Sequence, residues 1–265
     1  MFLDCHAHLE PFTDAEVGEI LDRAERVGVR AVISAGTTIA SSRRSLELSE
    51  KYDNFFSGVG IHPMDIREPF TESTYETLRD MAVSTEKVLV ISEVGLDFME
   101  GAPDRGIQYP AFREQIRLAR DLRLPVVFHS RESHDEAFRV LREERAYEVG
   151  GIMHYFQADY DTARRIIDLG FYVSLARPLL RLPHLQQAAA KIPLENIVLE
   201  TDAYPQPFKG KRENWTEPRH VAVVAETLAE LKGIEVEEVE EATTRNMRRV
   251  LGHGWATIEK YVRTS

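Results

Sequence analysis

The sequence lacks the features that mark secreted or membrane-spanning proteins. It contains a single cysteine, Cys5, so no disulfide can form within the chain. No apolar run approaches the roughly 18 residues of a membrane-spanning helix, and no basic segment followed by a long apolar run begins the chain. We therefore expect a cytoplasmic protein that has no membrane partner.

An excess of basic residues is also missing. The formal net charge is −11, which argues against a broad basic surface for gripping duplex DNA. The acidic balance does not exclude a phosphate-bearing substrate. Two divalent cations in a pocket would create a strong local positive field on an acidic protein.

Linkers, repeats and low-complexity tracts are absent as well. Glycine and proline are scattered, and the composition is 43% hydrophobic and 29% charged, as in ordinary globular proteins. We expect one domain spanning residues 1–265 and a monomer, because no feature indicates a stable protein partner.

What the sequence does contain is a regular alternation of strand and helix patterns. Continuous apolar runs are typical of parallel strands buried on both faces. Eight such units in about 250 residues predict a (β/α)8 TIM barrel, with a doubly wound open sheet as the alternative. A last helix is expected over residues 217–231, followed by two short helices within 235–251 on the outside. The first strand is expected to begin directly after Met1 and to carry His6 and His8 at its end. The other seven expected strands cover residues 31–36, 55–61, 88–92, 125–128, 150–153, 171–176 and 197–200.

Polar residues stand where the expected strands end. His6 and His8 are two positions apart, so on a strand they share a face at about 6.6 Å. The carboxyl-terminal ends of barrel strands form the active face, and six separate strands deliver potential ligands to it. The remaining histidines are interpreted as surface residues: His134, His184, His220 and His253. The residues at the strand ends are His6, His8, His62, Glu93, His129, His154 and Asp202.

Imidazole and carboxylate ligands without a thiolate suit Zn, Mn, Fe, Co or Mg. The set is too large for one tetrahedral ion, whereas two ions about 3.5–4 Å apart would share a bridging group. Glu93 is the natural bridge, because it lies between the two halves of the ligand set. Some related barrels bridge with a carboxylated lysine, but here Lys87 stands at the beginning of the fourth strand.

Six motifs in this order resemble the TatD family of metal-dependent deoxyribonucleases, which belong to the wider amidohydrolase-like barrels. The resemblance runs from residue 2 to about residue 252. It implies that one metal is held by His6, His8, Glu93 and Asp202, and the other by Glu93, His129 and His154. It also implies cleavage of phosphodiester bonds in DNA, often from the 3′ end. The motifs are Asp4-Cys5-His6-Ala7-His8-Leu9, Gly60-Ile61-His62-Pro63, Glu93-Val94-Gly95-Leu96-Asp97, His129-Ser130-Arg131, His154-Tyr155-Phe156 and Glu200-Thr201-Asp202.

Individual roles are expected for five polar residues in these motifs. Asp202 is expected to take the proton of a metal-bridging water as general base. His62 is expected to contact the substrate phosphate or transfer a proton, and Arg131 to bind a phosphate oxygen. Asp97 resembles a carboxylate that orients a ligand histidine, and Asp4 is expected to be structural.

Departures from the family lie in loops and leave the substrate open. Tyr155 follows His154, Arg177 follows the seventh strand, and Trp215 follows Asn214. Two functional alternatives therefore stand beside a 3′-5′ exodeoxyribonuclease acting on DNA or a small phosphodiester. One is a hydrolase of an amide, lactone or ester on the same two-metal site. The other is an idle scaffold, which is disfavoured because every expected ligand position is filled.

Overall fold

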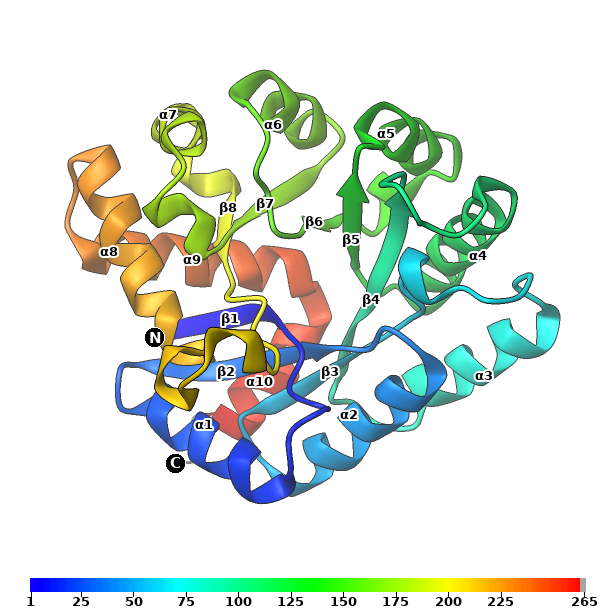
Figure 1. The fold of residues 1–265 in the computed structure, drawn as a ribbon, viewed down its shortest axis with the longest axis horizontal. Coiled ribbons are helices and arrows are strands. Elements are labelled where there is room, and N and C mark those ends of the chain that lie inside the picture. Colours follow the sequence, from blue (N-terminus) through cyan, green and yellow to red (C-terminus); the bar gives the residue numbers. More distant parts are fainter. Residues whose placement is uncertain (263–265) are drawn as a thin grey trace.

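A closed barrel forms the centre of the molecule. The computed structural model describes residues 1–262, and its eight strands pair in parallel in the order β1 to β8. Between the chain after β8 and the end of β1, Asp202 N donates to His6 O at 3.0 Å and His8 N donates to Ala203 O at 2.7 Å. These bonds join the last strand to the first, so the TIM barrel is confirmed and the open sheet is wrong (Figure 1). The strands are β1 (Phe2–Ala7), β2 (Val29–Ala35), β3 (Phe55–Val59), β4 (Val88–Asp97), β5 (Val126–Arg131), β6 (Gly151–Met153), β7 (Phe171–Leu175) and β8 (Ile197–Leu199).

Helices between the strands surround the barrel. Their starts follow from the sequence: Thr13 caps the first helix in a reciprocal arrangement with Glu16, and Thr38 and Thr71 cap the next two. Each helix turns its apolar side toward the strands, which closes the main core. The helices are α1 (Asp14–Glu25), α2 (Ile39–Lys51), α3 (Glu72–Val83), α4 (Arg105–Leu122), α5 (His134–Glu143), α6 (Tyr160–Ile167), α7 (Pro183–Lys191) and α8 (Val221–Lys232).

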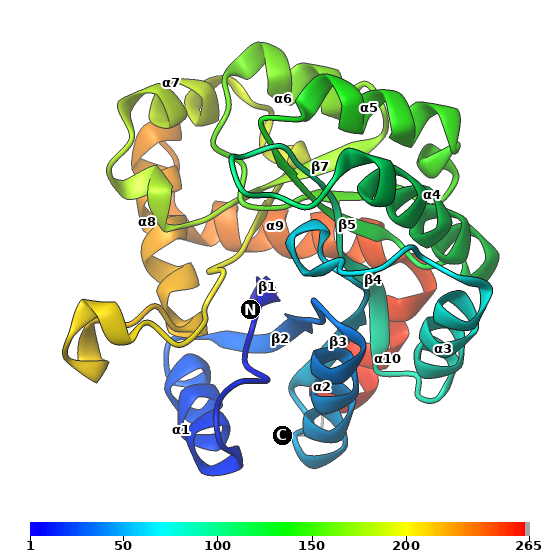
Figure 2. The same cartoon turned by 45° about the vertical axis from the view of Figure 1, so that its right-hand side comes forward.

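Extra C-terminal helices close the amino-terminal end of the barrel. The expected pair of short helices is wrong, because 235–251 contains one helix of 16 residues, α9 (Val236–Leu251), followed by α10 (Trp255–Val262). Both helices lie across this end of the barrel (Figures 1 and 2). Their apolar side chains pack with apolar residues of the strands. We call this group the floor cluster. Its buried members are Leu3, Cys5, Ala31, Ile33, Phe56, Leu89, Val90, Val127, Ile152, Val198, Met247, Val250, Leu251, Trp255 and Ile258.

Two strands depart from regular pairing close to predicted ligands. On β4, Ile91 pairs with Val126 and Val94 with Phe128, so β4 holds one extra residue at Glu93. On β1, Asp4 pairs with Val32 and Ala7 with Ser34, which places an extra residue beside His6. Such bulges re-aim side chains, and the strand continues beyond them. The expectation that β4 ends at Glu93 is therefore wrong.

None of the helices within residues 1–262 combines the length and apolar character needed to cross a membrane.

Candidate metal centre

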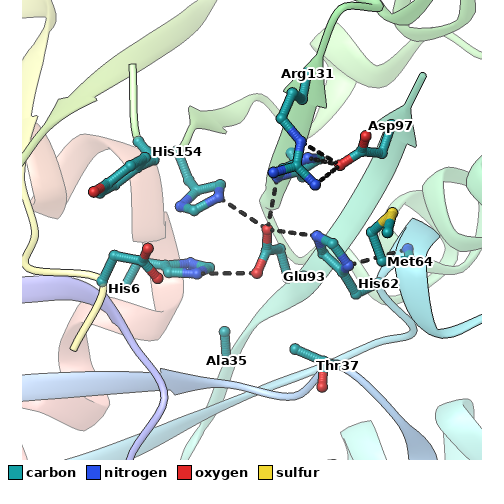
Figure 3. A network of polar contacts seen from close by, with 12 residues as sticks. His6, Ala35, Thr37, His62, Met64, Glu93, Asp97, Arg131 and His154 are labelled. Atoms are coloured by element: carbon teal, nitrogen blue, oxygen red, sulfur yellow. Dashed lines mark hydrogen bonds and ion pairs between the residues drawn. The ribbon is translucent and has the colours of Figure 1, made fainter. Parts of the chain in front are cut away.

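The carboxylate of Glu93 lies at the centre of the predicted ligands. Its side chain is buried, and the labelled imidazoles of His6, His62 and His154 point toward it from separate strands and loops (Figure 3). Oε2 lies 3.3 Å from Nε2 of both His6 and His8. Oε1 lies 2.9 Å from Nε2 of His154. The two oxygens of one carboxylate thus face different histidines.

Four side chains around Oε2 have the spacing of a metal-binding shell. The Nε2 atoms of His6 and His8 are 3.2 Å apart, and Nε2 of His8 lies 3.4 Å from Oδ1 of Asp202. Ligands in a tetrahedron about 2.0–2.1 Å from a central ion would be roughly 3.3–3.4 Å apart. The four measured separations, which are His6–His8, His6–Glu93, His8–Glu93 and His8–Asp202, lie at 3.2–3.4 Å and match that spacing.

A second group surrounds Oε1 of Glu93. Nδ1 of His129 and Nε2 of His62 each lie 3.2 Å from this oxygen, beside His154. Three overlapping groups could each hold a metal ion, and they are His6, His8 and Glu93; His6, His154 and Asp202; and His62, Glu93 and His129. The structure therefore brings together every residue of the predicted ligand set.

The tautomer of His8 provides a test of whether a cation fits. Its Nδ1 lies 3.1 Å from the carbonyl oxygen of Ala35, which accepts only from a protonated nitrogen. Nε2 of a neutral His8 therefore turns a lone pair toward the oxygens of Glu93 and Asp202. A nitrogen lone pair and carboxylate oxygens repel one another in a buried site, so a positive charge between them is needed. The donor set fits a bound divalent cation.

The pKa values indicate the same requirement for positive charge. Burial alone would lower the pKa of His8, but contacts with Asp202 and Glu93 raise it well above its usual value. For Glu93, burial would raise the pKa, but the positive field of His154 and the hydrogen bonds from His129 and His154 hold it well below its usual range. The carboxylate is thus kept ionised, which is the form that binds metal.

His62 differs from the other imidazoles at the centre. Its Nδ1 accepts a hydrogen bond from Met64 N at 3.1 Å, so the hydrogen of the neutral ring is on Nε2. Nε2 therefore donates toward Glu93 rather than offering a lone pair. This arrangement suits a hydrogen-bond donor and not a metal ligand.

Asp97 orients His129, as expected from the sequence. Its Oδ2 lies 2.8 Å from Nε2 of His129, which leaves Nδ1 of that ring facing Glu93. The same oxygen accepts from Nε of Arg131 at 2.8 Å, and the pKa of Asp97 is far below its usual range despite burial, because His129 and Arg131 both bond to it. Arg131 lines the cavity but holds Asp97, so its contact with a phosphate stays a prediction.

Two carboxyl groups of the site carry no assigned role in the sequence interpretation. Glu200 is fully buried, accepts from Tyr155 N at 2.7 Å, and places Oε1 3.3 Å from Nδ1 of His154 without hydrogen-bond geometry. Glu10 lies 3.9 Å from Nδ1 of His8. Glu200 could have been identified from the sequence, because it stands two residues before the predicted ligand Asp202. No local pattern marks Glu10.

Other expectations have mixed outcomes. Asp4 is structural, because it accepts from Thr201 N at 3.0 Å and ties β1 to the end of β8. His134 was expected on the surface but lines the central cavity, where its Nδ1 lies 2.7 Å from Ser130 Oγ. Trp215, one of the departures from the family, packs against Phe12 at 6.1 Å between ring centroids and does not line the central cavity.

The remaining expected surface histidines differ from one another. His184 and His253 are exposed, as predicted. His220 is half-buried, and its Nδ1 accepts from Glu217 N at 2.9 Å. Its assignment to the surface is therefore wrong.

The metal centre lies at the bottom of a cavity of about 590 Å³, which opens at the carboxyl-terminal mouth of the barrel. Three of its lining residues have left-handed backbone conformations, Glu132 with φ 55°, Tyr155 with φ 49° and Asp202 with φ 51°. Non-glycine residues adopt this region at a cost of about 1–3 kcal/mol, and such residues cluster at functional sites. The volume lies within the range of pockets that bind small-molecule ligands.

Comparisons with known proteins agree with this geometry. The chain is 34% identical to the uncharacterized metal-dependent hydrolase YabD of Bacillus subtilis over 94% of this chain and 98% of that protein. It is 32% identical to the human deoxyribonuclease TATDN3 over 92% of each. The crystal structure of YjjV, a TatD homologue from Escherichia coli, superposes with a TM-score of 0.85 at 28% identity, covering 94% of this chain and 97% of that one.

The family model described as TatD related DNase matches residues 3–252, which includes every strand of the barrel except the first residue of β1. The chain therefore belongs to the TatD-related DNase family.

Proposed function

We propose that this protein is a divalent-metal-dependent hydrolase that cleaves phosphodiester bonds in DNA, as a 3′-5′ exodeoxyribonuclease. The observation that carries the proposal is the carboxylate of Glu93, each oxygen of which faces its own histidines. The name of human TATDN3 as a deoxyribonuclease supports the choice of DNA. Two divalent ions, of Zn, Mn, Mg, Fe or Co, suit this donor set.

The two proposed ion sites share Glu93. His6, His8 and Asp202 complete one, and His129 and His154 complete the other. Divalent ions held there would lower the pKa of a coordinated water and would offset negative charge on the phosphoryl group. Ala35 O holds His8 and Asp97 holds His129 in the tautomers that turn a lone pair inward.

The protein's own groups then manage protons and charge. Asp202 is ionised, because contact with His8 outweighs burial and keeps the pKa of Asp202 below its usual value. Its carboxylate accepts the proton of the attacking water as general base. Nε2 of His62 donates to a phosphoryl oxygen, which lowers the energy of the more highly charged transition state.

A substrate panel tests the reaction class. The purified protein, supplied with Mn or Mg, is given a 3′-recessed DNA oligomer, a phosphomonoester, a lactone and a dipeptide. We expect shortening of the DNA from its 3′ end. Turnover of the lactone or dipeptide alone would reject the phosphodiester assignment in favour of a carbonyl hydrolase.

Elemental analysis tests the shared carboxylate. Two metal ions per chain are expected in the loaded wild-type protein. The control variant His253→Ala should also hold two ions, since His253 is exposed and lies outside the central cavity. A single ion per chain would contradict the bridging role of Glu93.

A further inference from the structure

A second cavity of about 510 Å³ adjoins the one above the metal centre. Both cavities are lined by Tyr155, Asp202 and Tyr204, so they meet at these side chains. The proposed reaction uses only the first. A substrate with its reacting phosphate at the metal centre can therefore continue into the second, whose volume suits a nucleotide.

The second cavity is cationic. Arg177, Arg181 and Lys209 line it, and in the part of the chain that the structure describes none of them forms a salt bridge with a carboxylate. Arg177 Nη1 and Lys209 Nζ both donate to Thr216 Oγ1 at 3.2 Å. Lys209 Nζ also donates to the amide oxygen of Gln206 at 2.7 Å. Neutral acceptors thus hold two of the three cations in place and leave their charge uncompensated. We call Arg177, Arg181 and Lys209 the cation cluster.

Two carboxylates beside this cavity are engaged with other side chains. Glu217, next to Thr216, contacts three other arginines, which are Arg23, Arg212 and Arg219. Asp202, at the boundary of the cavity, faces His8. The pKa of Lys209 is lowered by burial and by the positive fields of Arg177 and Arg181. Three cations in mutual repulsion on a chain of net charge −11 form a site that an anion stabilises.

Exposed aromatic rings border the same cavity. Phe208 is 71% exposed and Tyr204 is 38% exposed, and their ring centroids are 6.5 Å apart. The segment that carries them, yellow in Figure 2, projects from the barrel after β8. Aromatic rings beside a cationic groove are the arrangement that binds single-stranded nucleic acids, because bases stack on the rings while cations hold the phosphates.

We propose that the second cavity binds the nucleotide next to the one being cleaved. The cation cluster holds its phosphate, and Phe208 with Tyr204 stacks its base. The substrate is therefore the single-stranded end of a polynucleotide, not an isolated phosphate ester. This inference rests on the proposed phosphodiester hydrolysis and adds the part of the substrate that does not react.

Fluorescence anisotropy with a fluorescein-labelled oligothymidylate tests the proposal without metal or turnover. The variant Arg181→Gln/Lys209→Gln removes two charges at exposed or half-buried positions. The matched control is Lys211→Gln, since the Lys211 side chain is 80% exposed, pairs with Glu213 and lies outside the cavity. We expect the Kd of the double variant to rise at least about tenfold, since two charge-assisted contacts with the phosphate are lost.

Salt dependence supplies a second readout of the same variants. Losing two phosphate contacts should reduce the slope of log K against log salt by about 1.4 for a single strand. The control should retain the wild-type Kd and slope. Equal Kd and slope in all three proteins, including no binding by any of them, would overturn the proposal.

Phe208→Ala tests the stacking. We expect it to weaken binding of oligothymidylate at least about fivefold and to leave binding of an abasic oligomer unchanged. Equal losses for both oligomers, or none, would overturn the assignment of Phe208. Displacement of oligothymidylate by equimolar inorganic phosphate would indicate an isolated anion site and overturn the polynucleotide assignment. Because these measurements need no catalysis, they remain decisive if the panel of substrates shows no DNA cleavage.

Discussion

The two ends of the barrel are built on opposite principles. At the carboxyl-terminal mouth, buried imidazoles and carboxylates face one another around Glu93. At the amino-terminal end, the floor cluster packs apolar strand residues against α9 and α10. The mouth holds charged groups and strained backbone that a folded protein would otherwise avoid, and the floor provides apolar burial. Function and stability are thus concentrated at different ends of one set of strands.

The largest effect should follow from removing the shared carboxylate at the mouth. We expect Glu93→Ala to lower DNA hydrolysis about 10⁴-fold, or about 5.5 kcal/mol in activation free energy, because both ion sites lose a ligand. It should also lose more bound metal than His129→Ala, measured by elemental analysis. Equal metal contents in the two variants would contradict a bridging Glu93.

In the floor cluster we expect a substitution to lower stability and leave activity unchanged. Trp255→Ala removes a side chain that is 7% exposed and packed in the floor cluster. We expect the free energy of unfolding in urea to fall by about 3–4 kcal/mol, with kcat unchanged in the variant that remains folded. A loss of kcat without a loss of stability would show that the two ends are not independent.

A substitution of His62 should affect catalysis at the mouth without affecting metal binding. We expect His62→Ala to retain its metal and to lose about 10²-fold in kcat, since its Nε2 donates but offers no lone pair to an ion. Turnover kinetics and elemental analysis on the same preparation check this. A wild-type kcat would remove His62 from the mechanism.

The smallest effect concerns acid stability beside the mouth. Burial, with the positive fields of Arg177 and Arg219, lowers the pKa of His220 to about 4. The unfolded chain binds this proton near pH 6.5 and the folded chain does not, so stability falls as the pH decreases from about 6.5 to about 4 and then levels. After allowance for solvent screening, the loss should be about 1–2 kcal/mol.

The variant His220→Asn keeps an acceptor for Glu217 N but does not titrate in this range. Urea unfolding at pH 7 and pH 4.5 should therefore show a smaller acid loss in the variant than in the wild type. Identical losses would mean that protonation of His220 is not resisted by the fold.

Much of the metal centre could be predicted because strand ends in a parallel barrel converge. His6, His8, His129 and His154 each stand at or just past the end of an apolar run, so their meeting needs only the fold. Glu93 was predicted as a ligand because it was expected at the end of the fourth strand. It lies within the strand instead, since β4 continues four residues beyond it. An extra residue in the pairing with β5 turns its side chain into the mouth, and no local pattern in the sequence signals that irregularity.

Only part of the second cavity could be predicted from local patterns, because Arg177 and Tyr155 stand directly after expected strands, whereas Arg181, Lys209 and Phe208 carry no such signal. Arg181 lies at the end of a short turn before α7, and Lys209 lies in the segment after β8. Their proximity depends on how that segment folds back over the barrel, where Thr216 joins Lys209 to Arg177. Loop positions are set by long-range contacts, which periodicity and spacing do not encode.

By itself, the sequence determined the eight-unit alternation, and with it the barrel, the family and the ligand types gathered at its mouth. These depend on hydrophobic period and order along the chain, which are local properties. Only the tertiary structure decided that the two oxygens of Glu93 face different histidines, that His62 donates rather than accepts, and that a cation cluster lies beside the centre. Each of these depends on the direction of a side chain within a few ångströms, which only the packing of distant segments specifies.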